Sequence, residues 1–312
     1  MHTNWFFIAL IPAILWSIVN HIDKYILSKH FKGNGIGGIF LFSSLFSVIV
    51  LPCIVFLIPV YFLNISLLKG SILLFVGIIN AIAFYLYLKA LNEEETSIVI
   101  PLLQMIPVFA YLLGYPILGE ILSTQQLMSA AVVMLGVTVL SLDFDIDNHK
   151  ILVRKKILML IACSSLLFAL HDVLFKKFTT ESSFLVSAFW QHAGLTVTGI
   201  FVFIFSKRYR DQFKTIFKQN TVKILSLNII SEFLYILGNL ANSFATLLAP
   251  VALVLVVSSY QPLFVFIIGT ALTIFLPNIS SEKLSLKHLI QKLLSIIIIL
   301  IGSYFLYSSS IN

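Results

Sequence analysis

The feature that most constrains this chain is a succession of apolar stretches, each about 20 residues long and separated by short polar segments. A helix of that length crosses the roughly 30 Å of hydrocarbon in a bilayer, whereas a membrane β-barrel would show alternating segments of about 10 residues. Only 11% of the residues are charged, against about 25% in an average soluble domain. The sequence therefore predicts an all-α integral membrane protein.

Clusters of charged residues, Gly, Pro and Asn divide the chain into ten expected transmembrane helices. Their approximate ranges are 5–28, 36–60, 70–91, 97–119, 126–142, 157–177, 184–206, 222–244, 249–276 and 286–308. The two longest polar stretches, 142–156 and 206–220, are interpreted as loops, and the first lies near the middle of the chain. A join there predicts a first five-helix repeat at 1–145 and a second at 146–312.

Landmarks that recur in the same order support this division into repeats. They pair Trp16 with Phe168, Lys24 with Lys176, Pro107 with Pro262, and Glu120 with Glu282. An odd number of helices per repeat gives the two halves opposite orientations in the membrane. The expected fold is therefore ten transmembrane helices arranged as two inverted five-helix repeats.

Three short motifs carry a resemblance to a known family. They are Trp16 with Lys24, the run from Pro107-Val-Phe to Gly119-Glu120, and Gln126 with Gly136. With these motifs the chain resembles the drug/metabolite transporter superfamily, EamA type, over essentially its whole length. The resemblance implies a ten-helix carrier that moves amino acids, nucleotide-derived metabolites or other small solutes through a cavity between its halves. The chain departs from the pattern at Phe168, where Trp is favoured, and in an insertion before Glu282.

The distribution of positive charge predicts an orientation. Most of the 20 Lys and Arg residues fall in the first, third, fifth, seventh and ninth loops. The positive-inside rule places these loops in the cytoplasm and both termini outside. Members of the family are commonly drawn with both termini inside, so the charge distribution and the resemblance disagree on this point.

Polar and aromatic residues within the expected helices are the candidate solute-binding residues. A charge at the centre of a membrane helix costs about 2.5–3.5 kcal/mol, so such groups usually face a cavity or a partner. The candidates come from both halves of the chain, as expected for a site at the repeat interface. They are Trp16, Asn20, Asn80, His171, Asp172, Trp190, Gln191, His192, Glu232, Tyr235 and Asn239.

Glu232 lies close to the middle of its expected helix and has no charged residue three or four positions away. Its partner must therefore come from another helix, from water or from the solute. Tyr235 and Asn239 follow on nearly the same helix face and could line a cavity with it. We expect a carboxyl group that is protonated in the empty carrier and ionises when a cationic group enters.

Structural roles remain open for other candidates. Asp172 and Lys176 have the i,i+4 spacing of an intrahelical ion pair, with the acid in the favourable N-terminal position, so they could neutralise each other. His171 and His192 could either be hydrogen-bonded core residues or contact solute or a proton. Lys24 and Asp23 could extend from the end of their helix to the membrane surface.

Motifs for other kinds of chemistry are missing from the sequence. It contains no GxxxxGK[ST] motif for ATP and no HExxH motif for zinc, so we expect no catalytic residues, no metal and no cofactor. The net charge of +7 is explained by orientation in the membrane, and no nucleic-acid partner is expected. The expected surroundings are a multi-pass position in the cell (inner) membrane, with lipids as partners and a monomeric or homodimeric state.

The function predicted from these observations is secondary active transport of a small polar metabolite by alternating access. A buried carboxylate favours a solute that bears an amine, such as an amino acid, and a proton is a candidate coupling ion. The first alternative is a nucleotide-derived metabolite exchanger, in which Trp16, Tyr85, Trp190 and Tyr235 stack a base. The second is an integral-membrane lipid-modifying enzyme, which would need a polar cluster at the membrane surface.

Overall fold

The computed structural model describes residues 4–30, 36–57, 65–93, 99, 102–141, 155–179, 183–219, 222–275 and 286–309. Its regular elements are α-helices, and these residues contain no strand. The helices are α1 (Asn4–His30), α2 (Ile36–Leu57), α3 (Leu67–Glu93), α5 (Met105–Leu118), α6 (Thr124–Ser141), α7 (Lys155–Thr179), α8 (Phe184–Phe205), α9 (Lys207–Gln219), α10 (Val222–Leu248), α11 (Val251–Ser258), α12 (Gln261–Phe275) and α13 (Leu286–Ser308). The predicted join at residues 145 and 146 lies outside the described residues.

Seven segments in the described part of the chain are long and apolar enough to cross a membrane. They are α1, α2, α3, α7, α8, α11 together with α12, and α13. α5 and α6 are apolar but shorter. α10 is as long as α3 but falls outside this group, and it carries Asn228, Glu232, Asn239 and Asn242. The helices therefore indicate a multi-pass membrane protein whose α10 is unusually polar for its length.

The expected helix at 249–276 is interrupted. α11 ends at Ser258 and α12 begins at Gln261, with turn residues Ser259 and Tyr260 between them. Pro262 has no N–H group to donate to the carbonyl of Ser258, four residues earlier, and this loss weakens the helix at that point. A similar turn at residues 103–104 precedes α5, where Pro107 is the third helical residue.

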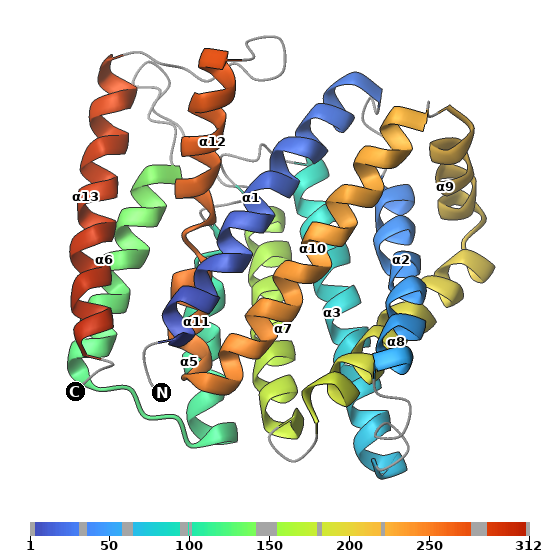
Figure 1. Ribbon diagram of the computed structural model, residues 1–312, viewed down its shortest axis with the longest axis horizontal. Helices are drawn as coiled ribbons and strands as arrows, with labels where there is room; N and C mark the ends of the chain where they lie inside the picture. The colour runs from blue at the N-terminus through green and yellow to red at the C-terminus, as the bar shows by residue number, and fades with distance from the viewer. Residues whose placement is uncertain are drawn as a thin grey trace.

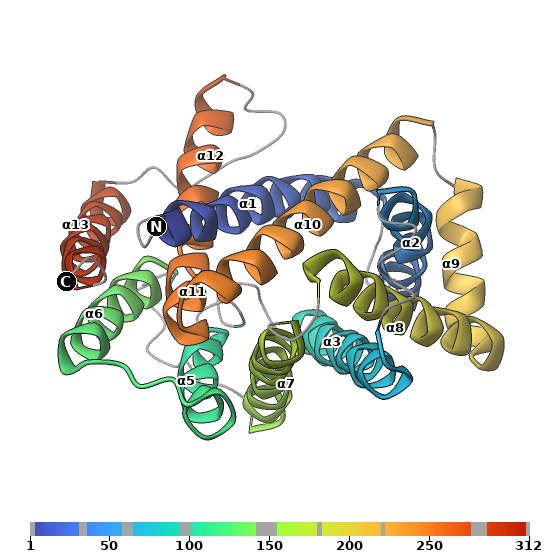
Figure 2. The ribbon, with the colours of Figure 1, turned by 60° about the horizontal axis from the view of Figure 1, so that its bottom comes forward.

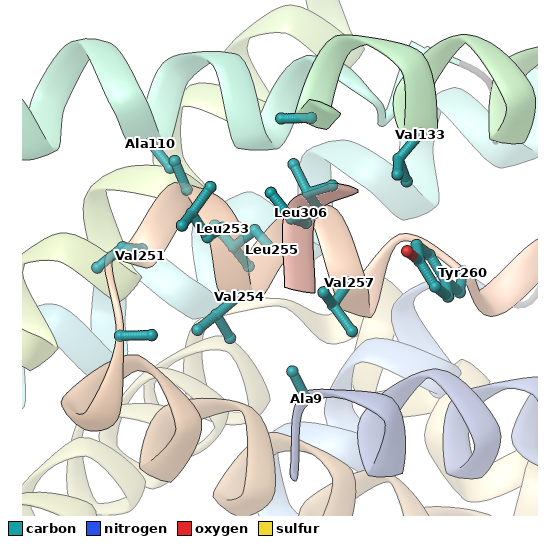
Figure 3. Packing of buried hydrophobic residues seen from close by; sticks show 14 of the residues in the cluster. Ala9, Ala110, Val133, Val251, Leu253, Val254, Leu255, Val257, Tyr260 and Leu306 are labelled. Atoms are coloured by element: carbon teal, nitrogen blue, oxygen red, sulfur yellow. The ribbon is translucent and has the colours of Figure 1, made fainter. Parts of the chain in front are cut away.

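The short helix α11 lies at the centre of the largest hydrophobic cluster (Figure 3). All eight of its residues are buried, as expected for a helix that is apolar on every side. Around it pack Ala9 of α1, Ala110 of α5, Val133 of α6 and Leu306 of α13. α11 therefore joins helices from both ends of the sequence in one core.

The stretch 206–220, expected as a loop, is largely helix α9. Gln212 Oε1 accepts the backbone N–H of Gly37 at 3.0 Å, one of the N–H groups in the first turn of α2 that have no partner within that helix. Arg210 Nη1 donates to the carbonyls of Phe203 and Ile204, each at 3.1 Å, at the C-terminal end of α8. α9 therefore caps the start of α2 and the end of α8.

Tyr209 gives α9 a further contact with the bundle. Its hydroxyl lies 3.0 Å from that of Tyr85 on α3. Desolvation, followed by this hydrogen bond, raises the pKa of Tyr209 to about 12, so the phenol stays neutral at physiological pH.

Helices from the two halves of the chain are interleaved (Figures 1 and 2). α13 packs along α6, α1 along α10, α2 along α8, and α3 along both α7 and α8. Within the described first half, by contrast, α2 and α3 share few contacts. The beginning of α1 and the end of α13 lie at the same end of the bundle (Figure 1). The bundle therefore depends mainly on contacts between the halves.

Candidate functional site

A pocket lies where α2, α3, α8 and α10 meet. It encloses about 360 Å³ of empty space, its opening included. The lining residues are Ser43, Ser44 and Ser47 of α2, Asn80 and Phe84 of α3, His192 and Leu195 of α8, and Glu232, Tyr235, Ile236 and Asn239 of α10. A small cavity with hydroxyl, amide, imidazole and carboxyl groups among apolar walls has the composition of a site for a small polar molecule.

Glu232 is the only acid among the described residues that line the pocket, and that lining contains no Lys or Arg. Its Oε1 accepts a short hydrogen bond from the hydroxyl group of Ser43 on α2. A serine of the first half is thus one of the partners of this carboxyl group on another helix. This bond connects the two sides of the pocket.

Aromatic rings stand beside this carboxyl group on α10. Tyr235 lines the pocket one turn from Glu232, and its ring centroid lies 6.2 Å from that of Phe84. The Tyr235 ring also lies 6.4 Å from the ring of Trp16 on α1. Aromatic faces attract cations, so this arrangement supports the same charge preference as the carboxylate.

His192 and Gln191 are neighbours on α8 but face different surroundings. His192 lines the pocket, and its Nδ1 lies 3.3 Å from the hydroxyl oxygen of Ser47 on α2. Gln191 contacts His171 of α7 instead, with 2.8 Å between the two Nε2 atoms. Consecutive helical residues point about 100° apart, which explains the difference.

Asp172 and His171 form a second polar cluster, next to the pocket and buried. His171 Nδ1 lies 3.2 Å from Asp172 Oδ1, which also accepts Nδ2–H of Asn242 at 3.4 Å. Ser258 donates to Asn242 Oδ1 at 2.8 Å. The cluster, completed by Gln191, therefore links α7, α8, α10 and α11.

The prediction that Lys176 pairs with Asp172 within one helix is wrong. Lys176 Nζ instead donates to Glu120 Oε1 at 2.6 Å and to the carbonyl of Ala249 at 2.7 Å. Glu120 Oε2 accepts the N–H of Val251 at 2.9 Å, at the start of α11. The ion pair thus fixes the junction of α10 and α11 against α7, and Asp172 is left to its own cluster.

Breaking this ion pair is expected to destabilise the fold. The two side chains are only 14% and 12% exposed, so Lys176→Met leaves a largely buried carboxylate and should cost about 3 kcal/mol. The double variant Glu120→Gln with Lys176→Met removes both charges and should recover part of that loss. Thermal unfolding in detergent measures both. A Lys176→Met protein that unfolds at the parent's temperature would contradict the prediction.

The structure brings together some of the predicted site residues and separates others. Asn80, His192, Glu232, Tyr235 and Asn239 line the pocket, while His171, Asp172 and Gln191 belong to the buried cluster. Trp16 reaches only the outer side of Tyr235. Asn20 lies half-buried on α1, outside the pocket lining. The side chains of Asp23 and Lys24 lie outside the described residues.

Trp190 does not contribute to the pocket. Its ring packs against Gly70 of α3 and joins a cluster with Leu73, Val76 and Phe175.

The sequence did not lead us to the three pocket serines and Asn242. Ser43, Ser44 and Ser47 give a signal, because they place hydroxyl groups on one face of an otherwise apolar segment.

Comparison with known proteins gives one family match and a shared fold. Residues 3–142 match the EamA-like transporter family. No curated protein matches the chain. One crystal structure superposes with a TM-score of 0.68 at 13% sequence identity, covering 98% of this chain and 96% of the other. At this identity, the structural likeness shows a common fold alone.

Proposed function

We propose that the chain is a secondary carrier of the drug/metabolite transporter superfamily for a small amine-bearing solute, since residues 3–142 match the EamA-like transporter family. The observation that carries this proposal is the position of Glu232. Glu232 places a carboxyl group in the lining of the pocket, and aromatic rings stand beside it. A protonated amine pairs with such a carboxylate and lies against the ring faces.

The arrangement of aromatic residues disfavours the nucleotide alternative. Of the four rings considered for stacking a base, only Tyr235 lines the pocket. The hydroxyl of Tyr85 is engaged with Tyr209, and Trp190 packs beside Gly70. A phosphate group would also meet Glu232 without a Lys or Arg in the described lining. An amine group pairs better with this lining.

The inverted repeat is supported by contacts that occur in related pairs. Exchanging the halves converts the packing of α1 along α10 into that of α7 along α3, and both are extensive. It converts the α6–α13 and α2–α8 contacts into themselves. The turns that precede Pro107 and Pro262 are related in the same way. These relations support five-helix repeats at 1–145 and 146–312.

One pair of contacts breaks this symmetry, and the difference supports our proposal of alternating access. α3 and α8 approach backbone to backbone at Gly77 and Gly194. The related helices, α10 and α2, are separated by the pocket and bridged by Glu232 and Ser43. By the residue offset that relates Pro107 to Pro262, Gly77 corresponds to Glu232. In the opposite state α10 would close on α2 while α3 separates from α8.

Uptake into proteoliposomes tests the proposal. The probes are the twenty labelled amino acids, putrescine, uridine and glucose, with empty liposomes as the control. We expect saturable uptake of at least one amine-bearing probe without an acidic side chain, and none of uridine or glucose. Transport restricted to uridine, glucose or acidic amino acids would contradict the assignment.

We place the carrier in the cell membrane as a monomer or homodimer, with a proton gradient as its driving force.

A further inference from the structure

The buried cluster of His171, Asp172 and Gln191 has a hydrogen-bonding pattern that defines the state of the imidazole. The amide nitrogen of Gln191 can only donate, so Nε2 of His171 accepts from it across the 2.8 Å contact. His171 Nδ1 then carries the hydrogen and donates to Asp172 Oδ1. This hydrogen-bonding pattern fits a neutral imidazole beside a carboxylate.

The cluster can hold one more proton if only the Gln191 amide group rotates. If Nε2 of His171 is protonated, a half-turn of the Gln191 amide presents Oε1 as an acceptor in place of Nε2. The imidazolium then donates to Asp172 on one side and to Gln191 on the other. All three residues are at most 6% exposed, so a charge gained here is felt strongly by its surroundings.

We propose that His171, with Asp172 and Gln191, is the proton-binding site of the carrier, separate from the solute pocket. The inference rests on the proposed function and assigns the site at which its coupling proton binds. A proton suits this cluster better than Na⁺, because alkali and alkaline-earth cations prefer several oxygen ligands. The described residues contain no group of three or more His, Cys, Asp or Glu that could hold a metal ion.

Two helices connect the proton site to the pocket. On α8, Gln191 of the cluster is followed directly by His192 of the pocket, and His171 is close enough to His192 for an electrostatic interaction. On α10, Asn242 of the cluster is one turn from Asn239 of the pocket. A proton on His171 adds a positive charge near the pocket and thus weakens binding of a cationic solute there. Because proton and solute disfavour each other's binding, the carrier is a proton–solute antiporter.

Few other ionisable groups in the described bundle compete for this role. α8 brings His192 towards α7, and α10 brings Glu232 and Tyr235. The ionisable side chains of α3 are phenols, apart from Lys69, Lys89 and Glu93 near its ends. α5 also contributes phenols, and α11 contributes no ionisable side chain. Phenols ionise near pH 10, and Lys176 is paired with Glu120.

The first experiment observes the proton directly and needs no solute. The full-length protein, labelled with ¹⁵N-histidine, is titrated by NMR, and His171 is identified by the signal lost in His171→Gln. Asp172→Asn should move its midpoint by about one pH unit or more to the acidic side. Gln191→Glu should move it to the alkaline side. Midpoints that move in opposite directions require both Asp172 and Gln191 to act on the His171 ring. The control Glu93→Gln should leave the His171 midpoint unchanged. An unchanged midpoint in both cluster variants, or a ring that never titrates, would overturn the proposal.

The second experiment measures coupling with the best-transported probe of the uptake panel. An acidic vesicle interior should increase uptake by the parent. Asp172→Asn and His171→Gln should lose that increase but keep exchange of labelled for unlabelled probe at equal pH. Loss of exchange would place both residues in solute binding and refute a separate proton site. If no probe is transported, the proposed function fails, while the titration still decides whether His171 binds a proton.

Discussion

Replacing Glu232 by Gln is expected to abolish accumulation of the amine-bearing solute while leaving the protein folded. Gln keeps the shape of the side chain and can still accept the hydrogen bond from Ser43, so the contact between α10 and α2 persists. The charge is lost, and a hydrogen bond to a charged group contributes about 1.5–3 kcal/mol. Because each 1.4 kcal/mol changes an affinity about tenfold, solute binding should weaken by about 10- to 100-fold.

Substrate-induced thermal stabilisation and proteoliposome uptake measure this effect. The matched control is Glu93→Gln, which removes an acid outside the pocket, at the end of α3, where Glu93 pairs with Lys156. The control should bind and transport like the parent. Should Glu232→Gln do the same at every pH tested, Glu232 would be a packing group, and the solute would have to be sought near Asp172 and His171.

The second large effect is expected for Gly77→Ala. A Cβ atom at Gly77 would lie 2.0 Å from the carbonyl oxygen of Gln191 and 3.0 Å from Cα of Gly194. Both neighbours are backbone atoms in the middle of α8, so no side chain can rotate away. The two helices must separate, and we expect a loss of about 3 kcal/mol, at the upper end of the cost of overpacking, together with loss of transport.

Gly114→Ala is the matched control, because it also adds a methyl group to a helical glycine. The nearest atom to its Cβ would be a carboxylate oxygen of Glu120, at 3.1 Å, so only a few tenths of an ångström of movement are needed, far less than at Gly77. Ala also favours helix over Gly by about 1 kcal/mol. Thermal unfolding should therefore separate the two variants clearly. Equal melting temperatures for Gly77→Ala and the parent would show that the close approach of α3 and α8 is not required.

The sequence predicts the apolar segments well because their length is imposed by the bilayer. It also selects Glu232, Tyr235 and Asn239 as one stripe, since their spacing alone puts them on one helix face. It does not reveal that Ser43 is the partner, because any hydroxyl at the same depth could have taken that place. Lys176 shows the same limit: Asp172 is one turn away, yet Glu120 from another part of the chain is its partner.

The break between α11 and α12 and the capping helix α9 are not predicted, for a different reason. A proline near the middle of an apolar run indicates a weakened helix, but whether the chain bends or restarts depends on what packs around it. At Tyr260 the outcome is a turn. α9 could have been recognised, because Tyr209 and Phe213 share one face among charged residues. Its caps at Gly37 and Phe203 depend on tertiary contacts that no local pattern contains.

The interleaving of helices also determines the order in which the protein can be completed during synthesis. α1 packs mainly along α10, and α6 along α13, so each must wait for a helix made much later. At about 5–20 residues per second, the chain between α1 and α10 takes roughly 10–40 s to synthesise. Throughout that interval, the faces of α1 that later contact Gly238 and Tyr235 have no partner. The contact faces of the first half therefore stay unburied by their final partners until the last helices are synthesised.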